Sequence, residues 1–335
     1  MGTGRWSTDL YDEHNRYKAA SGKSTFDYSD TLHNSSRDAW RVHASLNPLG
    51  VKFRESRDSA EHPNATAIAV MFDVTGSMGA VPVTLQQKLP QLLGLLLRKN
   101  YVSDPQILFG ALGDATCDRI PLQVGQFESD NRMDENLENI FLEGGGGGQQ
   151  TESYELGMYF IARHTAIDCW EKHGRKGYLF LIGDEMAYAR VSHSEVRHLI
   201  ADGLEVDIPL AEMVRELRQR YHVFYLLPKA ASYGGDKTIL KFWRNLLGQN
   251  VLELEDSETV CETIALAIGM MEGTIDLRAG MDDLRTYNAT PETLQTVSKA
   301  LANLPTSPLT ARASAGTLFG LAAKALPDGK VRRRL

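Results

Sequence analysis

Cysteine is scarce in this chain. Its 335 residues include three cysteines, Cys117, Cys169 and Cys261, which lie far apart and form no C-x-x-C pair. An odd and scattered set of this kind argues against a disulfide framework and is typical of a compartment in which thiols stay reduced. We therefore expect a cytoplasmic protein whose cysteines serve as small buried apolar residues.

Long apolar runs and an excess of basic residues are also missing. No segment approaches the roughly 18 apolar residues of a membrane-spanning helix, and residues 1–15 have no apolar signal-peptide core. Acidic side chains outnumber basic ones, 43 against 36, for a formal net charge of −7. This balance argues against a nucleic-acid binder that relies on a basic surface. We therefore expect neither a membrane nor a nucleic acid as a partner.

The composition is that of an ordinary globular protein. The chain is 42% hydrophobic and 24% charged, which excludes wholesale disorder and collagen-like or coiled-coil rods. At about 150 residues per domain, the length suggests one large domain with appendages, or two small domains.

Short apolar runs alternate with helical patterns through the middle of the chain. Residues 65–73 (ATAIAVMFD) are nearly all apolar, as expected of a central parallel strand buried on both faces. Leucines at helical spacing follow over residues 79–100, where Pro90 should kink or split the helix. The same patterns predict strands at 106–112, 122–127, 177–182 and 222–227, and helices at 134–142, 152–167, 210–221, 237–247, 257–271 and 291–304. We therefore predict an α/β fold, a Rossmann-like, doubly wound, mostly parallel sheet with helices on both faces.

The two ends of the chain are less regular than its centre. Residues 1–64 are polar with scattered aromatics, and we expect an irregular N-terminal arm whose aromatics dock on the main domain. Residues 65–276 form the predicted domain. Residues 277–335 form a partly helical C-terminal extension that ends in a basic cluster, which we interpret as a solvated terminus.

A group of oxygen-bearing side chains follows the first predicted strand. In the segment Asp73-Val74-Thr75-Gly76-Ser77-Met78, alternate positions place Asp73, Thr75 and Ser77 on one side of the loop. In an open α/β sheet, ligands bind at the carboxyl ends of strands. Carboxylate and hydroxyl oxygens suit a hard cation such as Mg²⁺, Mn²⁺ or Ca²⁺ rather than zinc.

Two later segments add oxygen ligands at comparable places. The glycine run Gly144–Gly148 leads to Thr151 at the start of a predicted helix, and Asp184 follows the strand at 177–182. Together with Asp73, Thr75 and Ser77, these residues are two carboxylates and three hydroxyls, which leaves room for water and one outside ligand.

These motifs resemble the von Willebrand factor A family with its metal-ion-dependent adhesion site. The resemblance rests on Asp-x-Thr-x-Ser at 73–77, the glycine-rich loop with Thr151, and Gly183-Asp184 after a strand, and it spans residues 65–272. The usual first motif is Asp-x-Ser-x-Ser, so Thr75 replaces a serine and keeps the hydroxyl. Motifs in this order and strand context are more specific than any one of them alone.

The resemblance implies a function without catalysis. Ser77, Thr75 and Thr151 would be inner ligands of a divalent cation, with Asp73 and Asp184 acting largely through water. A partner protein would fill the open position with an Asp or Glu side chain. Intracellular bacterial members often work beside MoxR-type AAA+ ATPases, so such an ATPase is the partner class that the resemblance implies.

Two other interpretations of the same residues stay open. Thr75 or Ser77 could simply cap the next helix in an ordinary turn. Alternatively, a strand that ends in Asp-x-Thr resembles the haloacid dehalogenase-like phosphoryl hydrolases, although these need an acid where Thr75 stands. Asp114 and Asp118, after the second strand, could line the rim of the site or make local turns.

Overall fold

The computed structural model describes residues 27–145 and 148–305, together with residues 6, 7, 9, 10, 13, 16 and 17. The predicted basic tail and Gly146 and Gly147 of the glycine run lie outside the described residues.

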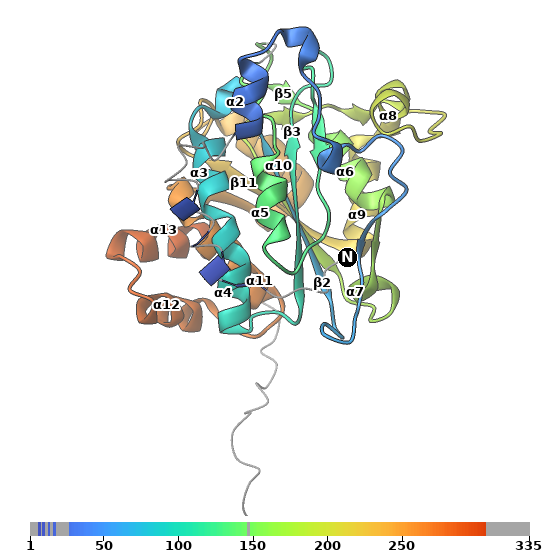
Figure 1. The fold of residues 1–335 in the computed structure, drawn as a ribbon. Coiled ribbons are helices and arrows are strands. Elements are labelled where there is room, and N and C mark those ends of the chain that lie inside the picture. The colour runs from blue at the N-terminus through green and yellow to red at the C-terminus, as the bar shows by residue number, and fades with distance from the viewer. Residues whose placement is uncertain are drawn as a thin grey trace, which may run out of the picture.

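A six-stranded sheet forms the centre of the molecule (Figure 1). Its strand order is β12-β11-β7-β2-β3-β4, and only β4 runs antiparallel to its neighbour. The strands are β2 (Thr66–Asp73), β3 (Pro105–Leu112), β4 (Leu122–Val124), β7 (Gly177–Ile182), β11 (Tyr221–Pro228) and β12 (Val251–Leu254). The predicted α/β fold with a mostly parallel sheet is therefore confirmed.

Helices cover both faces of this sheet because successive side chains of a strand point to opposite sides. Ile68, Val70 and Phe72 of β2 pack against one group of helices, and Ala67 and Met71 pack against the other. The first group is α3 (Val81–Lys88), α4 (Pro90–Lys99), α5 (Arg132–Glu138) and α11 (Val260–Met271). The second is α6 (Tyr154–Arg163), α7 (Asp168–Glu171), α9 (Leu210–Arg220) and α10 (Lys237–Leu247). Every residue of β2 is buried, as its apolar run predicts.

The strand order places a crossover point beside β2. The chain continues from β2 to β3 on one side of the sheet centre, and it later builds β7, β11 and β12 on the other side. The carboxyl ends of β2 and β7 therefore meet where the strand order reverses. In open α/β sheets this is the place where ligands bind.

Local sequence signals explain how several elements begin and end. The predicted helix over residues 79–100 is split at Pro90, because proline lacks the amide proton that would continue the hydrogen-bond ladder. The second half ends at Asn100, whose φ of 50° is left-handed, a conformation that asparagine tolerates. The N-cap of helix α10 is Asp236, whose carboxylate accepts hydrogen bonds from the amides of Thr238 and Ile239.

The N-terminal segment packs against the domain through aromatic rings and a short strand. It contains α2 (Asp27–His33), the single turns η1 (Arg37–Ala39) and η2 (Ala44–Leu46), and β1 (Arg54–Ser56), which pairs with β6 (Thr165–Ile167). The ring centroids of Trp40 and Phe141 lie 4.9 Å apart, and His33 stacks on the same phenylalanine at 4.9 Å.

The C-terminal segment adds two helices beside α11. These are α12 (Leu277–Thr286), which the sequence patterns did not predict, and α13 (Pro291–Leu301). Leu284 of α12 and Val297 and Leu301 of α13 are buried in the same core as α11. Several short elements also escaped the patterns: β5 (Thr151–Glu152), β8 (Met186–Ala187), β9 (Arg190–Val191), α8 (His193–Leu199), β10 (Ile208–Pro209), η4 (Gly248–Asn250) and β12. Within the part of the chain that the structure describes, no helix has the length and apolar character needed to cross a membrane.

We predict that Gly157→Ala destabilises the protein although alanine favours helices. A Cβ at Gly157 on α6 would lie 2.7 Å from Leu112 Cδ2 and 3.3 Å from Met71, so these buried side chains must repack or the helix must shift. Overpacking typically costs about 1–3 kcal/mol, more than the roughly 1 kcal/mol that alanine gains in helix propensity. Urea unfolding should show the loss. Gly235→Ala, which meets no atom within 4 Å, is the control; equal stabilities for the two variants would contradict the packing.

Candidate metal site

The first predicted site residue lies at the end of the central strand. Asp73 is the last residue of β2 and is fully buried. Its Oδ1 accepts hydrogen bonds from the Thr75 amide at 2.8 Å and the Thr75 hydroxyl at 2.6 Å. Its Oδ2 accepts a hydrogen bond from the Tyr154 hydroxyl at 2.7 Å. Both oxygens of this carboxylate are thus engaged by neighbouring side chains of the chain itself.

A second carboxylate is joined to the same loop across the crossover point. Ser77, in the single turn η3 (Gly76–Met78), donates its hydroxyl to Asp184 Oδ1 at 2.8 Å, and its Oγ lies 3.3 Å from Thr75 Oγ1. The other oxygen of Asp184 accepts the amide of Tyr233 at 2.9 Å. The structure therefore brings together four of the five predicted residues, Asp73, Thr75, Ser77 and Asp184.

The glycine run packs directly on this loop. The Gly144 amide donates to the carbonyl of Val74 at 3.1 Å, and the Gly76 amide donates to the carbonyl of Gly145 at 2.6 Å. A Cβ at Gly76 would lie 3.0 Å from both carbonyl oxygens of Gly144 and Gly145. Glycine at position 76 therefore permits the close approach of the two loops.

The fifth predicted residue occupies a different position from the other four. Thr151 and Glu152 form the short strand β5, which pairs in parallel with β8 just after Asp184. Successive strand residues point to opposite sides. Here Glu152 is buried and lines the cavity beside Ser77, whereas Thr151 is half-buried and is not one of its lining residues. The structure therefore places Glu152, rather than Thr151, next to the Asp73 loop.

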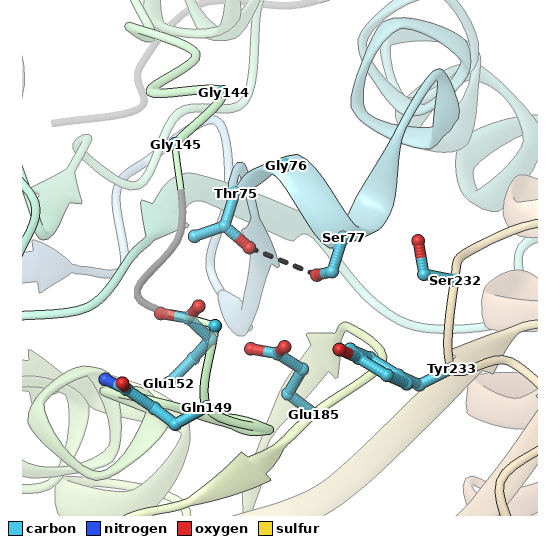
Figure 2. A pocket seen from close by; sticks show the side chains of 11 residues that line it. Thr75, Gly76, Ser77, Gly144, Gly145, Gln149, Glu152, Glu185, Ser232 and Tyr233 are labelled. Atoms are coloured by element: carbon cyan, nitrogen blue, oxygen red, sulfur yellow. Dashed lines mark hydrogen bonds between the residues drawn. The ribbon is translucent and has the colours of Figure 1, made fainter.

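A cavity of about 460 Å³ opens beside these residues (Figure 2). Its lining residues come from three parts of the chain: Thr75–Ser77, then Gly144, Gly145 and Gly148 of the glycine run with Gln149 and Glu152, and finally Glu185, Ser232 and Tyr233. Glu185 follows Asp184 directly in the sequence and was not among the predicted ligands. Its place in Gly183-Asp184-Glu185, one residue beyond a predicted ligand at a strand end, was the signal that could have identified it.

A layer of aromatic rings holds the base of the site. The rings of Tyr225 and Trp243 stack with centroids 3.9 Å apart, and both side chains donate hydrogen bonds to the Glu185 carbonyl, at 3.0 and 2.8 Å. The rings of Tyr154 and Trp243 pack edge to face with centroids 5.5 Å apart. The Tyr154 hydroxyl, at the end of that ring, donates a hydrogen bond to Asp73. A Cβ at Gly183 would lie 1.8 Å from the Tyr154 hydroxyl, so only glycine leaves room for that contact.

Asp114 repeats the turn of Asp73 at the end of the next strand. Its Oδ1 accepts the amide and hydroxyl of Thr116, both at 2.8 Å. Its carboxylate also accepts hydrogen bonds from the Tyr188 hydroxyl and from Gln149, a residue that lines the cavity. Asp118, the other predicted rim residue, accepts the Asp114 amide at 2.7 Å. Among the described residues, neither aspartate lines the cavity itself.

The site is strongly acidic, and burial raises the pKa of its carboxyl groups. Burial raises the pKa of Asp73 to about 7, although the hydrogen bonds from Thr75 and Tyr154 lower it. Burial likewise raises the pKa of Asp184. The pKa values of Glu152 and Glu185 are raised by burial and by neighbouring carboxylates, and these two carboxyl groups lie within hydrogen-bonding reach of each other. None of the described residues that line the cavity is Lys, Arg or His.

The donor set fits a hard divalent cation. Every polar side chain on the described lining offers an oxygen, and Glu152 Oε2 and Glu185 Oε2 are buried with no hydrogen-bond partner. Oxygen-only sites are typical of Mg²⁺, Mn²⁺ and Ca²⁺. In the described part of the chain, no three His, Cys, Asp or Glu side chains cluster as a metal centre. A coordination shell at this site would also draw on the hydroxyls of Thr75 and Ser77, which line the cavity.

Comparison with known proteins gives structural neighbours only. No family model matches the chain, and no curated protein matches it. The pilus adhesin SpaC of Lactobacillus rhamnosus GG, in its open conformation, aligns with a TM-score of 0.43 and 9% identity over 64% of this chain and 31% of SpaC. A second structure of SpaC aligns at 0.42 and 10% identity over 64% of this chain and 32% of that one.

A third neighbour is a different kind of protein. The proximal thread matrix protein 1 of the mussel byssus aligns with a TM-score of 0.39 and 9% identity, over 67% of this chain and 46% of that protein. The chain thus spans less than half the length of these proteins. Likeness at this level says nothing of what the chain binds.

We predict that the cation-free protein loses stability as the pH rises, in part through Asp73. Its pKa rises from 3.8 unfolded to about 7 folded, so the folded state binds more protons between those pH values and stability falls across them. At about 1.4 kcal/mol per pKa unit, the loss is on the order of 4 kcal/mol. Thermal unfolding in chelator from pH 4 to 8 should show this fall, and Asp73→Asn should flatten it. Asp282→Asn, at an exposed position on α12, is the control. A fall of stability with pH that is as steep in Asp73→Asn as in this control would contradict the assignment of the effect to Asp73.

Proposed function

We propose that residues 65–276 form a von Willebrand factor A-like domain that binds a partner protein through a divalent cation. The observation that supports this best is the hydrogen bond from Ser77 to Asp184 Oδ1 at 2.8 Å. It joins the ends of β2 and β7 at the crossover point, beside a cavity lined by oxygen atoms. The order of these residues in the sequence matches the motifs of that family.

In this proposal Thr75 and Ser77 supply hydroxyl ligands, and Asp73 and Asp184 support them. Each hydroxyl donates its proton to one of these carboxylates, which leaves its lone pairs available to a cation. The family's set of ligands also includes a loop threonine, here Thr151, which does not line the cavity in this structure. The cation, when bound, supplies a compact positive charge that an Asp or Glu of the partner can contact. A MoxR-type AAA+ ATPase in the cytoplasm is the partner class that the family resemblance adds.

The geometry gives no support to the alternative of a phosphoryl hydrolase. That chemistry needs a general acid two residues after the nucleophilic aspartate, and Thr75 occupies that position. The Thr75 hydroxyl donates to Asp73 Oδ1 at 2.6 Å, so it acts as a partner of the carboxylate in the turn. We therefore propose a binding module without catalysis.

We predict that Mg²⁺ or Mn²⁺ raises the thermal stability of the full chain. A ligand at a hundredfold excess over its Kd adds about 2.7 kcal/mol. Ser77→Ala should lose most of this gain, whereas Ser194→Ala, at an exposed position on α8, should keep it. Differential scanning fluorimetry with and without cation measures the effect. Equal melting temperatures with and without saturating cation would contradict the proposal, and hydrolysis of a generic phosphate ester that disappears in Asp73→Asn would favour the hydrolase.

We also predict that partner binding requires the cation. A pull-down with the full chain should capture a partner in Mg²⁺ or Mn²⁺, lose it in chelator, and lose it with Ser77→Ala but not with Ser194→Ala. Replacing the partner's contacting Asp or Glu by its amide should reduce the amount captured by at least about tenfold, because a charged contact to the cation is removed. A partner retained equally in chelator would bind elsewhere on the chain.

A further inference from the structure

The two walls of the cavity differ in how their carboxylates are used. Asp73 and Asp184 lie behind the wall, and among the described residues neither lines the cavity. Glu152 and Glu185 do line it, and Figure 2 shows their carboxyl groups on the side of the cavity that faces Thr75 and Ser77. The carboxylates with direct access to a bound ion are therefore the two glutamates.

The hydrogen bonds separate the same two pairs. Both oxygens of Asp73 and both oxygens of Asp184 accept hydrogen bonds from groups of the chain. Glu152 Oε2 and Glu185 Oε2 accept no hydrogen bond from a donor group of the chain, although the two residues are only 2% and 3% exposed. Burying a charged oxygen without a partner is expensive. A cation between the two carboxyl groups, or a proton that they share, would compensate this cost.

The backbone holds the two glutamates in place independently of any ion. β5 and β8 pair in parallel with Glu152 opposite Ala187, which fixes the direction of the Glu152 side chain. The Glu185 carbonyl accepts hydrogen bonds from Tyr225 and Trp243, which fixes the backbone from which its side chain projects. The two carboxyl groups are therefore held toward the cavity before an ion arrives.

We propose that Glu152 and Glu185 are direct ligands of one divalent cation, together with the hydroxyls of Thr75 and Ser77. This inference rests on the proposed function, since it concerns the ligands of the same site. It assigns Asp73 and Asp184 as positioning residues that orient the two hydroxyls. Two carboxylates, two hydroxyls and water form an oxygen shell of the size that Mg²⁺ or Mn²⁺ requires.

The test is Mn²⁺ binding to the full chain by isothermal titration calorimetry after removal of metal by chelator. We expect one Mn²⁺ per wild-type chain and at least about tenfold weaker binding for Glu152→Gln and for Glu185→Gln, because each change removes a charged ligand. The matched control is Glu155→Gln. Glu155 is fully buried on α6, three residues from Glu152, but does not line the cavity. Its variant should bind Mn²⁺ within about twofold of wild type.

The outcomes separate this inference from the proposed function. If Ser77→Ala loses Mn²⁺ while both glutamine variants bind it as wild type does, the inference fails and the proposed function stands. If the wild-type chain binds no Mn²⁺, both fail. Two Mn²⁺ per wild-type chain would overturn the assignment of a single shared ion.

A measurement on the wild-type chain avoids dependence on variant folding. In pulsed electron paramagnetic resonance of the Mn²⁺-loaded protein, carbon-13 in the glutamate carboxyl groups should give a strong hyperfine coupling to the ion. Carbon-13 in the aspartate carboxyl groups should give a weaker one, because Asp73 and Asp184 lie behind the hydroxyls. The reverse ranking would overturn the proposal.

Discussion

The candidate site depends on where the parallel sheet reverses its strand order. β2 is buried on both faces and pairs with β3 on one side and β7 on the other, so its last residue lies between loops that leave in opposite directions. Asp73 is therefore fixed at the one edge where loops from β2 and β7 meet side by side. The hydrogen bond from Ser77 to Asp184 follows from that arrangement, and so does the cavity beside it.

The carboxyl groups of the site are buried, so they lose favourable interactions with water. Several carboxyl groups share a small volume, and among the described residues that line the cavity no basic side chain balances them. Their raised pKa values have burial as the first cause. Tyr154 and the stacked pair Tyr225 and Trp243 support the backbone and carboxylates from below. In the proposed function, this acidic pocket is the place that receives the divalent cation.

The sequence predicted five of the six strands of the main sheet and most of the loop residues for a physical reason. Apolar runs such as residues 65–73 report burial on both faces, and the carboxyl ends of parallel strands converge wherever they lie in the chain. For this reason Asp73, Ser77 and Asp184 could be placed together from the sequence. The split of the helix at Pro90 was predictable from the geometry of proline alone.

The residues that sequence reasoning missed belong to elements that are too short to show a repeating pattern of apolar and polar residues. β5 has two residues, so no alternation could show whether Thr151 or Glu152 points inward. The side that each residue takes depends on the pairing with β8, a long-range contact that the local sequence does not encode. The role of Tyr154 is of the same kind: its hydroxyl reaches Asp73 only because position 183 has no side chain.

The loop after β11 also touches both halves of the site. The Ser232 amide donates to the Ser77 carbonyl at 2.9 Å, and the adjacent Tyr233 amide donates to Asp184. Neighbouring amides of the loop after β11 thus hydrogen-bond to the loop after β2 and to the loop after β7. Any displacement of Ser77 therefore also stretches the hydrogen bond to Ser232, so the position of the loop after β2 is mechanically coupled to that of the loop after β11.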